Sequence, residues 1–103
     1  MDTDTAVREL YERFPYPPPI DDIRPFLDGT KCATWNPRDS WPLYFPEEPA
    51  RADIDILVAG CGTRAGVMMA ACMPEARVTA VDISERSLAI SEETARQGGM
   101  TNI

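Results

Sequence analysis

The hydrophobic positions at the start of the chain repeat with the spacing of an amphipathic helix. They stand three and four residues apart, so a helix over residues 3–14 would carry them on one face. Asp4 or Thr5 is the expected N-cap, and Pro15 ends the helix. The residues of this apolar face are Val7, Leu10, Tyr11 and Phe14.

Prolines dominate the next segment of the chain. Nine of the ten lie between Pro15 and Pro49, so regular secondary structure is not expected there. The segment is nevertheless rich in aromatic residues, which disordered chains usually lack. We therefore predict an ordered wrap that packs its rings onto the rest of the protein. These rings are Tyr16, Phe26, Trp35, Trp41, Tyr44 and Phe45.

From residue 54 onward the pattern changes to alternating strands and helices. Residues 54–59 form a nearly continuous apolar run, which is typical of a strand covered on both faces. Residues 65–73 predict a short helix that Pro74 ends, and its methionines are interpreted as core residues. Residues 78–82 predict a second strand, parallel to the first.

A longer helix is predicted after the second strand. Ser84 is its expected N-cap, and the helix runs to about Gln97. Gly98 and Gly99 supply a left-handed C-terminal stop, and residues 100–103 approach a third strand.

Two strands do not close a parallel sheet, so the pattern predicts a fragment of a larger protein. We expect residues 54–103 to be the N-terminal half of a domain. Residues 1–53 would be a helical and aromatic-rich extension in front of it.

Two glycines and a carboxylate stand at the ends of the two predicted strands. Gly60 and Gly62 flank Cys61, and Asp82 follows Gly62 by twenty residues. Parallel strands bring these positions to one edge of the sheet, where the nucleotide-binding crevice of such folds lies. Glycine lets a ligand lie against the backbone, and a carboxylate accepts hydrogen bonds from both ribose hydroxyls. The pattern predicts a nucleoside-containing cofactor, and it also satisfies the dinucleotide fingerprint.

Longer stretches around these residues closely resemble class I S-adenosylmethionine-dependent methyltransferases. The resemblance implies a Rossmann-like α/β fold, truncated to its first βαβα part, behind an N-terminal helix and a Pro-rich extension. It also implies S-adenosylmethionine as the cofactor and a transferase activity for the parent protein. The stretches that carry it are residues 56–63, 78–84, 87–88 and 99–103, and residues 11–18 resemble a Tyr-Glu…Pro-Tyr-Pro stretch of one bacterial branch.

The resemblance assigns roles to the residues at the strand ends. Gly60, Cys61 and Gly62 would line the methionine and ribose part of the cofactor. Asp82 would accept hydrogen bonds from the ribose hydroxyls, and Ile83 would pack on the adenine. No catalytic residue is assigned, because the acceptor site is expected outside this chain. The chain alone is therefore expected to be inactive and to bind the cofactor weakly.

Four positions in or near these stretches are interpreted separately. Many family members have an acid where this chain has Val58 and a glycine where it has Arg64. The missing acid would have helped to hold the cofactor's amino group, and Arg64 is expected to point to solvent. Cys61 is interpreted as a small filler, and Tyr16 as a structural ring rather than a lid over the cofactor.

Two alternative functions stay open on the sequence. One is an NAD(P)- or flavin-dependent oxidoreductase, which would use the same kind of crevice. The other is a non-catalytic module for dimerisation or docking. In that case, two copies would pair through the uncovered apolar strand at residues 54–59.

Composition narrows the range of partners and the cellular compartment. The chain has 17 acidic and 10 basic residues, a net charge of −7, so contact with nucleic acid is not expected. Three cysteines without Cys-x-x-Cys spacing, and no histidine, argue against a zinc site and favour reduced thiols in the cytoplasm. No apolar run is long enough to span a bilayer, and the acidic N-terminus does not resemble a secretory signal.

Overall fold

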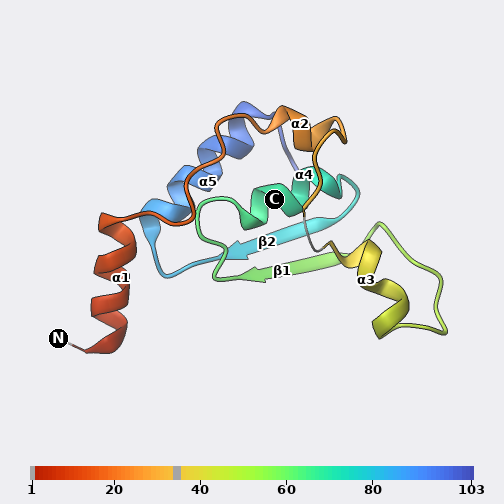
Figure 1. The fold of residues 1–103 in the computed structure, drawn as a ribbon, viewed down its shortest axis with the longest axis horizontal. Coiled ribbons are helices and arrows are strands. Elements are labelled where there is room, and N and C mark those ends of the chain that lie inside the picture. Colours follow the sequence, from red (N-terminus) through yellow and green to blue (C-terminus); the bar gives the residue numbers. More distant parts are fainter. Residues whose placement is uncertain (1, 34–35) are drawn as a thin grey trace.

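The computed structural model describes residues 2–33 and 36–103 and shows a small α/β domain (Figure 1). Within these residues it contains five helices and a two-stranded parallel sheet. The order of elements in the second half is strand, helix, strand, helix. In chain order the elements are α1 (Thr3–Arg13), α2 (Arg24–Leu27), α3 (Pro37–Tyr44), β1 (Asp55–Ala59), α4 (Ala65–Cys72), β2 (Arg77–Val81) and α5 (Glu85–Gln97).

The sheet is covered on one face and open on the other. β1 and β2 pair in register from Asp55 opposite Arg77 to Ala59 opposite Val81. Alternate side chains, such as Val58 and Val78, are buried against α4, whereas those between them are exposed. The prediction that the first strand is covered on both faces is therefore wrong for the described residues. The apolar run does not alternate, so it could not reveal which face stays open.

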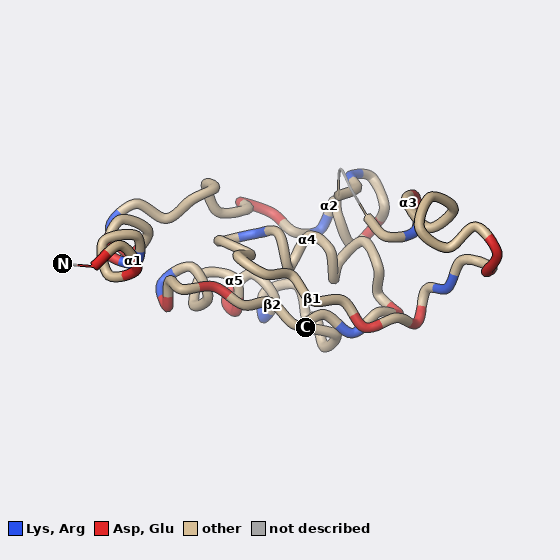
Figure 2. Tube along the Cα trace, turned by 90° about the horizontal axis from the view of Figure 1, so that it is seen from below, with Lys and Arg blue, Asp and Glu red and all other residues tan. Residues whose placement is uncertain are grey.

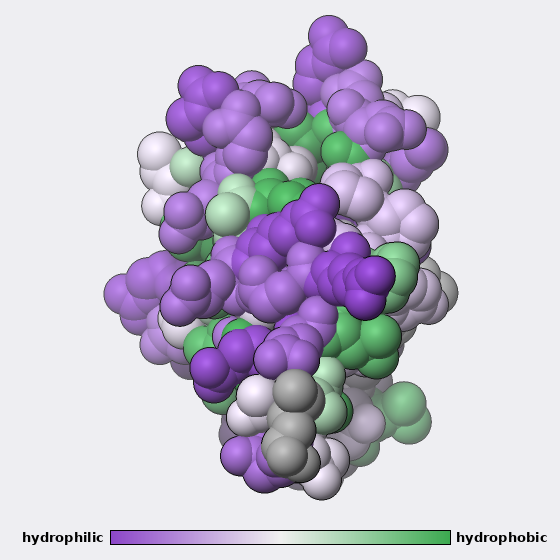
Figure 3. All heavy atoms as spheres, turned by 90° about the vertical axis from the view of Figure 1, so that its left-hand side faces the viewer, coloured by the Kyte–Doolittle hydropathy of each residue, from purple (hydrophilic) through white to green (hydrophobic). Residues whose placement is uncertain are grey.

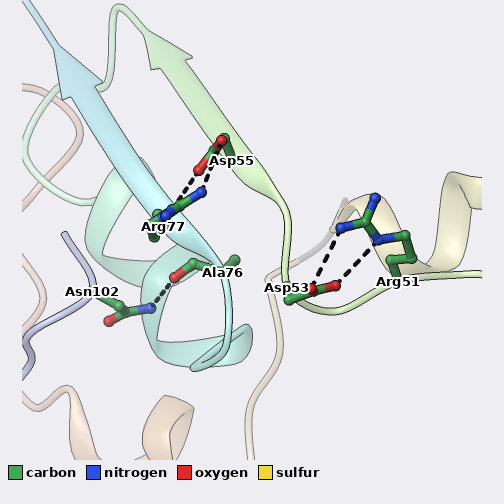
Figure 4. A network of polar contacts seen from close by, with 6 residues as sticks. All are labelled: Arg51, Asp53, Asp55, Ala76, Arg77 and Asn102. Carbon is green, nitrogen blue, oxygen red and sulfur yellow. Dashed lines mark hydrogen bonds and ion pairs between the residues drawn. The ribbon is translucent and has the colours of Figure 1, made fainter.

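The open face carries both charged and apolar side chains. The guanidinium of Arg77 makes two hydrogen bonds to the carboxylate of Asp55 across the strands, at 2.7 and 3.2 Å (Figure 4). Farther along β1, Leu57 is 66% exposed. Arg51 and Asp53 form a second exposed ion pair just before β1.

Two apolar clusters make up the core. One joins β1, α4 and β2, and contains Val58, Met69, Met73 and Val78. The other joins the N-terminal segment to α4 and α5, because Ile23 packs with residues of both helices. The predicted core role of the methionines is confirmed for Met69 and Met73, whereas Met68 is half-buried.

The Pro-rich segment is more regular than its composition indicates. It contains the single turn α2 and the eight-residue helix α3, so the prediction of no regular structure is wrong. Pro37 stands at the start of α3, where a helix does not need the missing N–H. Asn36 caps this helix by accepting a hydrogen bond from the N–H of Asp39 at 3.1 Å.

The aromatic rings of this segment behave in two ways. Trp41 is buried against Phe45 at a centroid distance of 4.8 Å, and its indole N–H donates to the carbonyl of Glu48. Tyr16 and Tyr44 are exposed, so only part of the predicted wrap packs its rings. Trp35 lies outside the described residues.

Local structure defines both ends of α5 and the place of the residues that follow it. Ser84 caps α5 as predicted, accepting from the N–H of Ser87 at 3.1 Å, and Gly99 adopts the left-handed conformation with φ of 63°. The N–H of Val78 then donates to the carbonyl of Asn102 at 2.8 Å, so the last residues lie along β2. The side-chain amide of Asn102 reaches the carbonyl of Ala76 (Figure 4).

Helix α1 projects from one end of the molecule (Figure 1). Its N-cap is Asp2, which accepts from the N–H of Thr5 at 2.7 Å, so the predicted caps Asp4 and Thr5 are wrong by two or three positions. Seen from this end, the surface mixes hydrophilic and hydrophobic side chains (Figure 3). Lys and Arg are scattered among Asp and Glu along the whole trace (Figure 2). In the described ranges, no helix is long and apolar enough to cross a membrane.

Candidate functional site

The candidate site lies where β1 and β2 end. β1 leads directly into the turn Gly60-Cys61-Gly62, and Asp82 follows the last residue of β2. The N–H of Cys61 donates to the carbonyl of Val81 at 3.0 Å, which holds the two strand ends together. Residues twenty positions apart in the sequence thus become neighbours at one edge of the sheet.

The two glycines of the turn are required for different structural reasons. Both adopt the left-handed conformation, with φ of 68° at Gly60 and 56° at Gly62. A Cβ added at Gly60 would meet no atom within 4 Å, so its backbone is open on that side. A Cβ at Gly62 would lie 2.6 Å from the carbonyl oxygen of Tyr16. Gly60 therefore leaves room for a ligand, whereas Gly62 leaves room for the Pro-rich segment.

Asp82 fixes the glycine turn to the start of α5. One carboxylate oxygen accepts the N–H of Gly62 at 2.8 Å, and the other accepts the N–H of Ser84 at 2.9 Å. A carboxylate oxygen can accept two hydrogen bonds, so each retains one acceptor position. Asp82 can therefore cap the turn and still accept hydrogen bonds from a ligand.

All five residues assigned from the sequence border one open cavity of about 600 Å³. This volume falls within the range of roughly 300–1,000 Å³ found for small-molecule sites. The walls come from the glycine turn, the end of β2, the start of α5 and the N-terminal segment. The lining residues are Tyr11, Tyr16, Pro17, Gly60, Cys61, Gly62, Ala65, Val81, Asp82, Ile83 and Ser87.

Cys61 has the environment of a protonated thiol. Its side chain is buried, and burial raises its pKa, with the nearby charge of Asp82 raising it further. A thiol with a raised pKa is a poor nucleophile at neutral pH. This agrees with the interpretation of Cys61 as a small filler in the turn.

The neighbouring positions that depart from the methyltransferase pattern lie outside the cavity wall. Val58 points into the core under the sheet. Arg64 is half-exposed at the start of α4 and does not border the cavity among the described residues.

Two tyrosines at the cavity were not assigned to it from the sequence. Tyr11 was placed on the apolar face of the first helix, and Tyr16 was interpreted as structural, yet both border the cavity. The spacing of Tyr11 within its helix is that of a core residue, so periodicity gave no indication of a site. The resemblance of residues 11–18 to a bacterial methyltransferase branch assigned neither tyrosine a role at the site.

The comparisons with known proteins place the chain in a family. The uncharacterized phycocyanin operon protein W of Pseudanabaena tenuis is 32% identical to it over 96 residues. The alignment covers 89% of this chain and 86% of that protein. The chain belongs to the phycocyanin operon protein W family. No family model matches the sequence.

A second relative of this chain is much longer. It is an uncharacterized protein of Synechococcus sp., 31% identical over 106 aligned residues. The alignment covers 94% of this chain and 23% of that protein. The shared sequence is thus most of one relative and about a quarter of the other.

Proposed function

We propose that the chain binds S-adenosylmethionine and is the cofactor-binding part of a class I methyltransferase with a Rossmann-like fold. The observation that carries the proposal is the cavity at the ends of two parallel strands, bordered by the glycine turn and Asp82. An α/β sheet binds ligands at this edge, and a nucleoside fits its size.

The polar groups of the cavity fit an adenosyl ligand. Asp82 offers one further acceptor position on each carboxylate oxygen, which matches the two hydroxyls of a ribose. Gly60 leaves its backbone uncovered, so the ligand can lie against it. Ile83 adds an apolar surface beside Asp82 for the adenine.

The same groups are poorly suited to a pyrophosphate. A phosphate-binding turn needs backbone N–H groups that are free to donate to the anion. In this turn the N–H of Gly62 already donates to Asp82 and is not free for a phosphate. S-adenosylmethionine carries no phosphate and makes no such demand on the turn. The site therefore favours S-adenosylmethionine over a dinucleotide.

The contribution of this chain to methyl transfer would be positioning. When bound, S-adenosylmethionine supplies an electrophilic methyl group and a neutral thioether leaving group. Asp82 would fix the ribose, and the glycine turn would support the methionine part, so that the ligand is held in one orientation.

Binding can be tested by titrating the purified chain with S-adenosylhomocysteine and, separately, with NADH. We expect S-adenosylhomocysteine to shift the backbone NMR signals of Gly60, Gly62 and Ile83, with little effect from NADH. Asp82→Ala should weaken binding about 10-fold or more, because hydrogen bonds to a charged group contribute roughly 1.5–3 kcal/mol each. Tighter binding of NADH would favour the oxidoreductase alternative, and binding of neither ligand would overturn the proposal.

Two variants control for indirect effects of that substitution. Asp55→Ala removes an exposed carboxylate that pairs with Arg77 on the open face of the sheet, away from the cavity, and should bind normally. Asp82→Asn keeps one acceptor for the turn, and thermal unfolding shows whether each variant is folded.

A further inference from the structure

The N-terminal segment forms part of the wall of the candidate site. Tyr11 of α1 and Tyr16 after it border the same cavity as Gly60 and Asp82. Their side chains are 36% and 66% exposed, so a large part of each ring is free to contact a ligand. These residues precede the glycine turn by some fifty positions, and tertiary contacts alone bring them there.

The segment after α1 is anchored on the glycine turn. The hydroxyl of Thr63 donates to the carbonyl of Pro17. The carbonyl of Tyr16 passes so close to Gly62 that no Cβ would fit between them. The backbone that carries Tyr16 is therefore held at the base of the cavity.

Helix α1 is held against α5 by Glu12. The carboxylate of Glu12 accepts the backbone N–H of Arg86 at 3.1 Å, in the first turn of α5. The Arg86 guanidinium donates in return to the carbonyl of Glu12 at 2.8 Å. No residue of α1 is buried in the described part of the chain, so these polar contacts carry much of its docking. Glu12 follows Tyr11 directly, and the same contacts fix the place of that ring.

We propose that Tyr11 and Tyr16 are ligand-contacting residues of this site and that Glu12 is the positioning residue that holds Tyr11 over it. The ligand they fit is one with a flat aromatic base, because aromatic rings stack on such a base. The inference rests on the proposed function for the identity of the ligand. The docking of α1 through Glu12 is independent of that identity.

The ring contacts can be tested with S-adenosylhomocysteine as the probe. Tyr11→Ala and Tyr16→Ala should each weaken binding about 2- to 10-fold, the range expected for one aromatic contact of roughly 0.5–1.5 kcal/mol. Tyr11→Phe should retain most of the affinity. Tyr44→Ala is the matched control, because this exposed tyrosine lies in α3 and borders a different cavity.

If Glu12 positions Tyr11, the effects of substituting these two residues on ligand binding should not be additive. Glu12→Ala should weaken binding, and Glu12→Gln, which keeps an acceptor oxygen, should restore part of the loss. In the Tyr11→Ala background, Glu12→Ala should cause no further loss, because the ring that it positions is gone. A general loss of structure would instead add to the effect of Tyr11→Ala. Glu9→Gln removes a carboxylate from the same helix and serves as the control.

The docking itself can be measured without ligand. The backbone N–H of Arg86 should exchange with solvent faster in Glu12→Ala than in the wild type. Unchanged exchange, or additive losses in the double variant, would overturn the positioning role. If the wild type binds the probe and the variants Tyr11→Ala and Tyr16→Ala bind it as tightly as the wild type, the two rings do not contact the ligand. The proposed function would still stand. If the wild type does not bind it, both proposals fail.

Discussion

Two glycines in one turn illustrate how differently the same residue type can be required. Gly60 has a left-handed backbone with open space beside it, whereas Gly62 has a left-handed backbone with the Tyr16 carbonyl against it. The sequence pattern treats them alike, because both belong to one Gly-x-Gly turn. Only the contact between the turn and the Pro-rich segment separates them.

Gly62→Ala should destabilise the protein more than an alanine at an open left-handed position. The left-handed conformation costs a non-glycine residue about 1–2 kcal/mol. At Gly62 the added Cβ would also lie 2.6 Å from a backbone oxygen, so the segment at Tyr16 has to move. We expect a loss of roughly 2–4 kcal/mol in urea unfolding.

Gly29→Ala is the control for that substitution. Its φ of 84° is also left-handed, but no atom lies within 4 Å of an added Cβ, so only the backbone cost should appear. Equal losses for the two variants would contradict the close approach at Gly62.

Glu93 provides a test of charge at the residue scale. The guanidinium of Arg96 and the amide of Gln97 donate to its carboxylate and lower its pKa from 4.5 to about 2. Because this pKa is lower in the folded state, the stabilisation is fully present above about pH 4.5 and is lost as the pH falls to 2. In an NMR titration, Arg96→Met should raise the pKa of Glu93 towards 4.5. A smaller rise is expected for Gln97→Met, and an unchanged pKa in Arg96→Met would contradict this cause.

At the scale of elements, a single side chain joins the last residues of the chain to α4. The amide nitrogen of Asn102 lies 3.0–3.1 Å from the carbonyl oxygens of Ala70, Met73 and Ala76. These carbonyls end α4 and lead into β2, where helical partners are missing. Asn102 therefore links the helix end to the edge of the sheet.

Removing this amide should destabilise the protein measurably. Asn102→Ala removes the amide donor from these partly buried carbonyls, of which that of Met73 keeps the N–H of Ala76, and should cost about 1–3 kcal/mol in urea unfolding. Asn102→Asp has the same size but points a carboxylate at three carbonyl oxygens, so it should lose more at neutral pH. Thr101→Ala, at the exposed neighbouring position, should change stability by less than about 0.5 kcal/mol. An equal loss in Thr101→Ala would point to a general effect of this segment.

The elements with strong local signals could be predicted from the sequence. The helix before Pro15, the helix before Pro74 and the helix from Ser84 to Gln97 are confirmed within one residue. Prolines follow the first two, and the cap Ser84 marks the start of the third. α3 was missed because the abundance of prolines outweighed the local signal of Asn36 followed by Pro37. Asn at the N-cap followed by Pro in the first turn is a favourable start for a helix.

Contacts between distant segments could not be predicted in the same way. The strand pattern did not reveal the open face of the sheet, because that depends on which elements lie over it. The place of Tyr11 depends on the contact between Glu12 and Arg86, which has no signature near either residue. The residues of the glycine turn could be grouped in advance, since parallel strands bring their ends together.

At the scale of the whole molecule, β1 has an edge that pairs with no strand in the described ranges. Such an edge can pair with another strand, and the sequence led to the expectation that two copies associate through it. Light scattering of the purified chain tests this, with a dimer as the expected result. Leu57→Lys should favour the monomer, because it places like charges near the two-fold axis of a paired edge. A wild-type monomer at high concentration would contradict the prediction.

The contact between Glu12 and Arg86 also has a consequence for biosynthesis. The two residues are 74 positions apart, so α1 cannot dock until α5 has been translated. At about 5–20 residues per second, this delay is roughly 4–15 s. During that interval α1 lacks the hydrogen bonds that hold it against α5. Helix α1 is thus made before the helix that it docks against, and it reaches its final place only after α5 has formed.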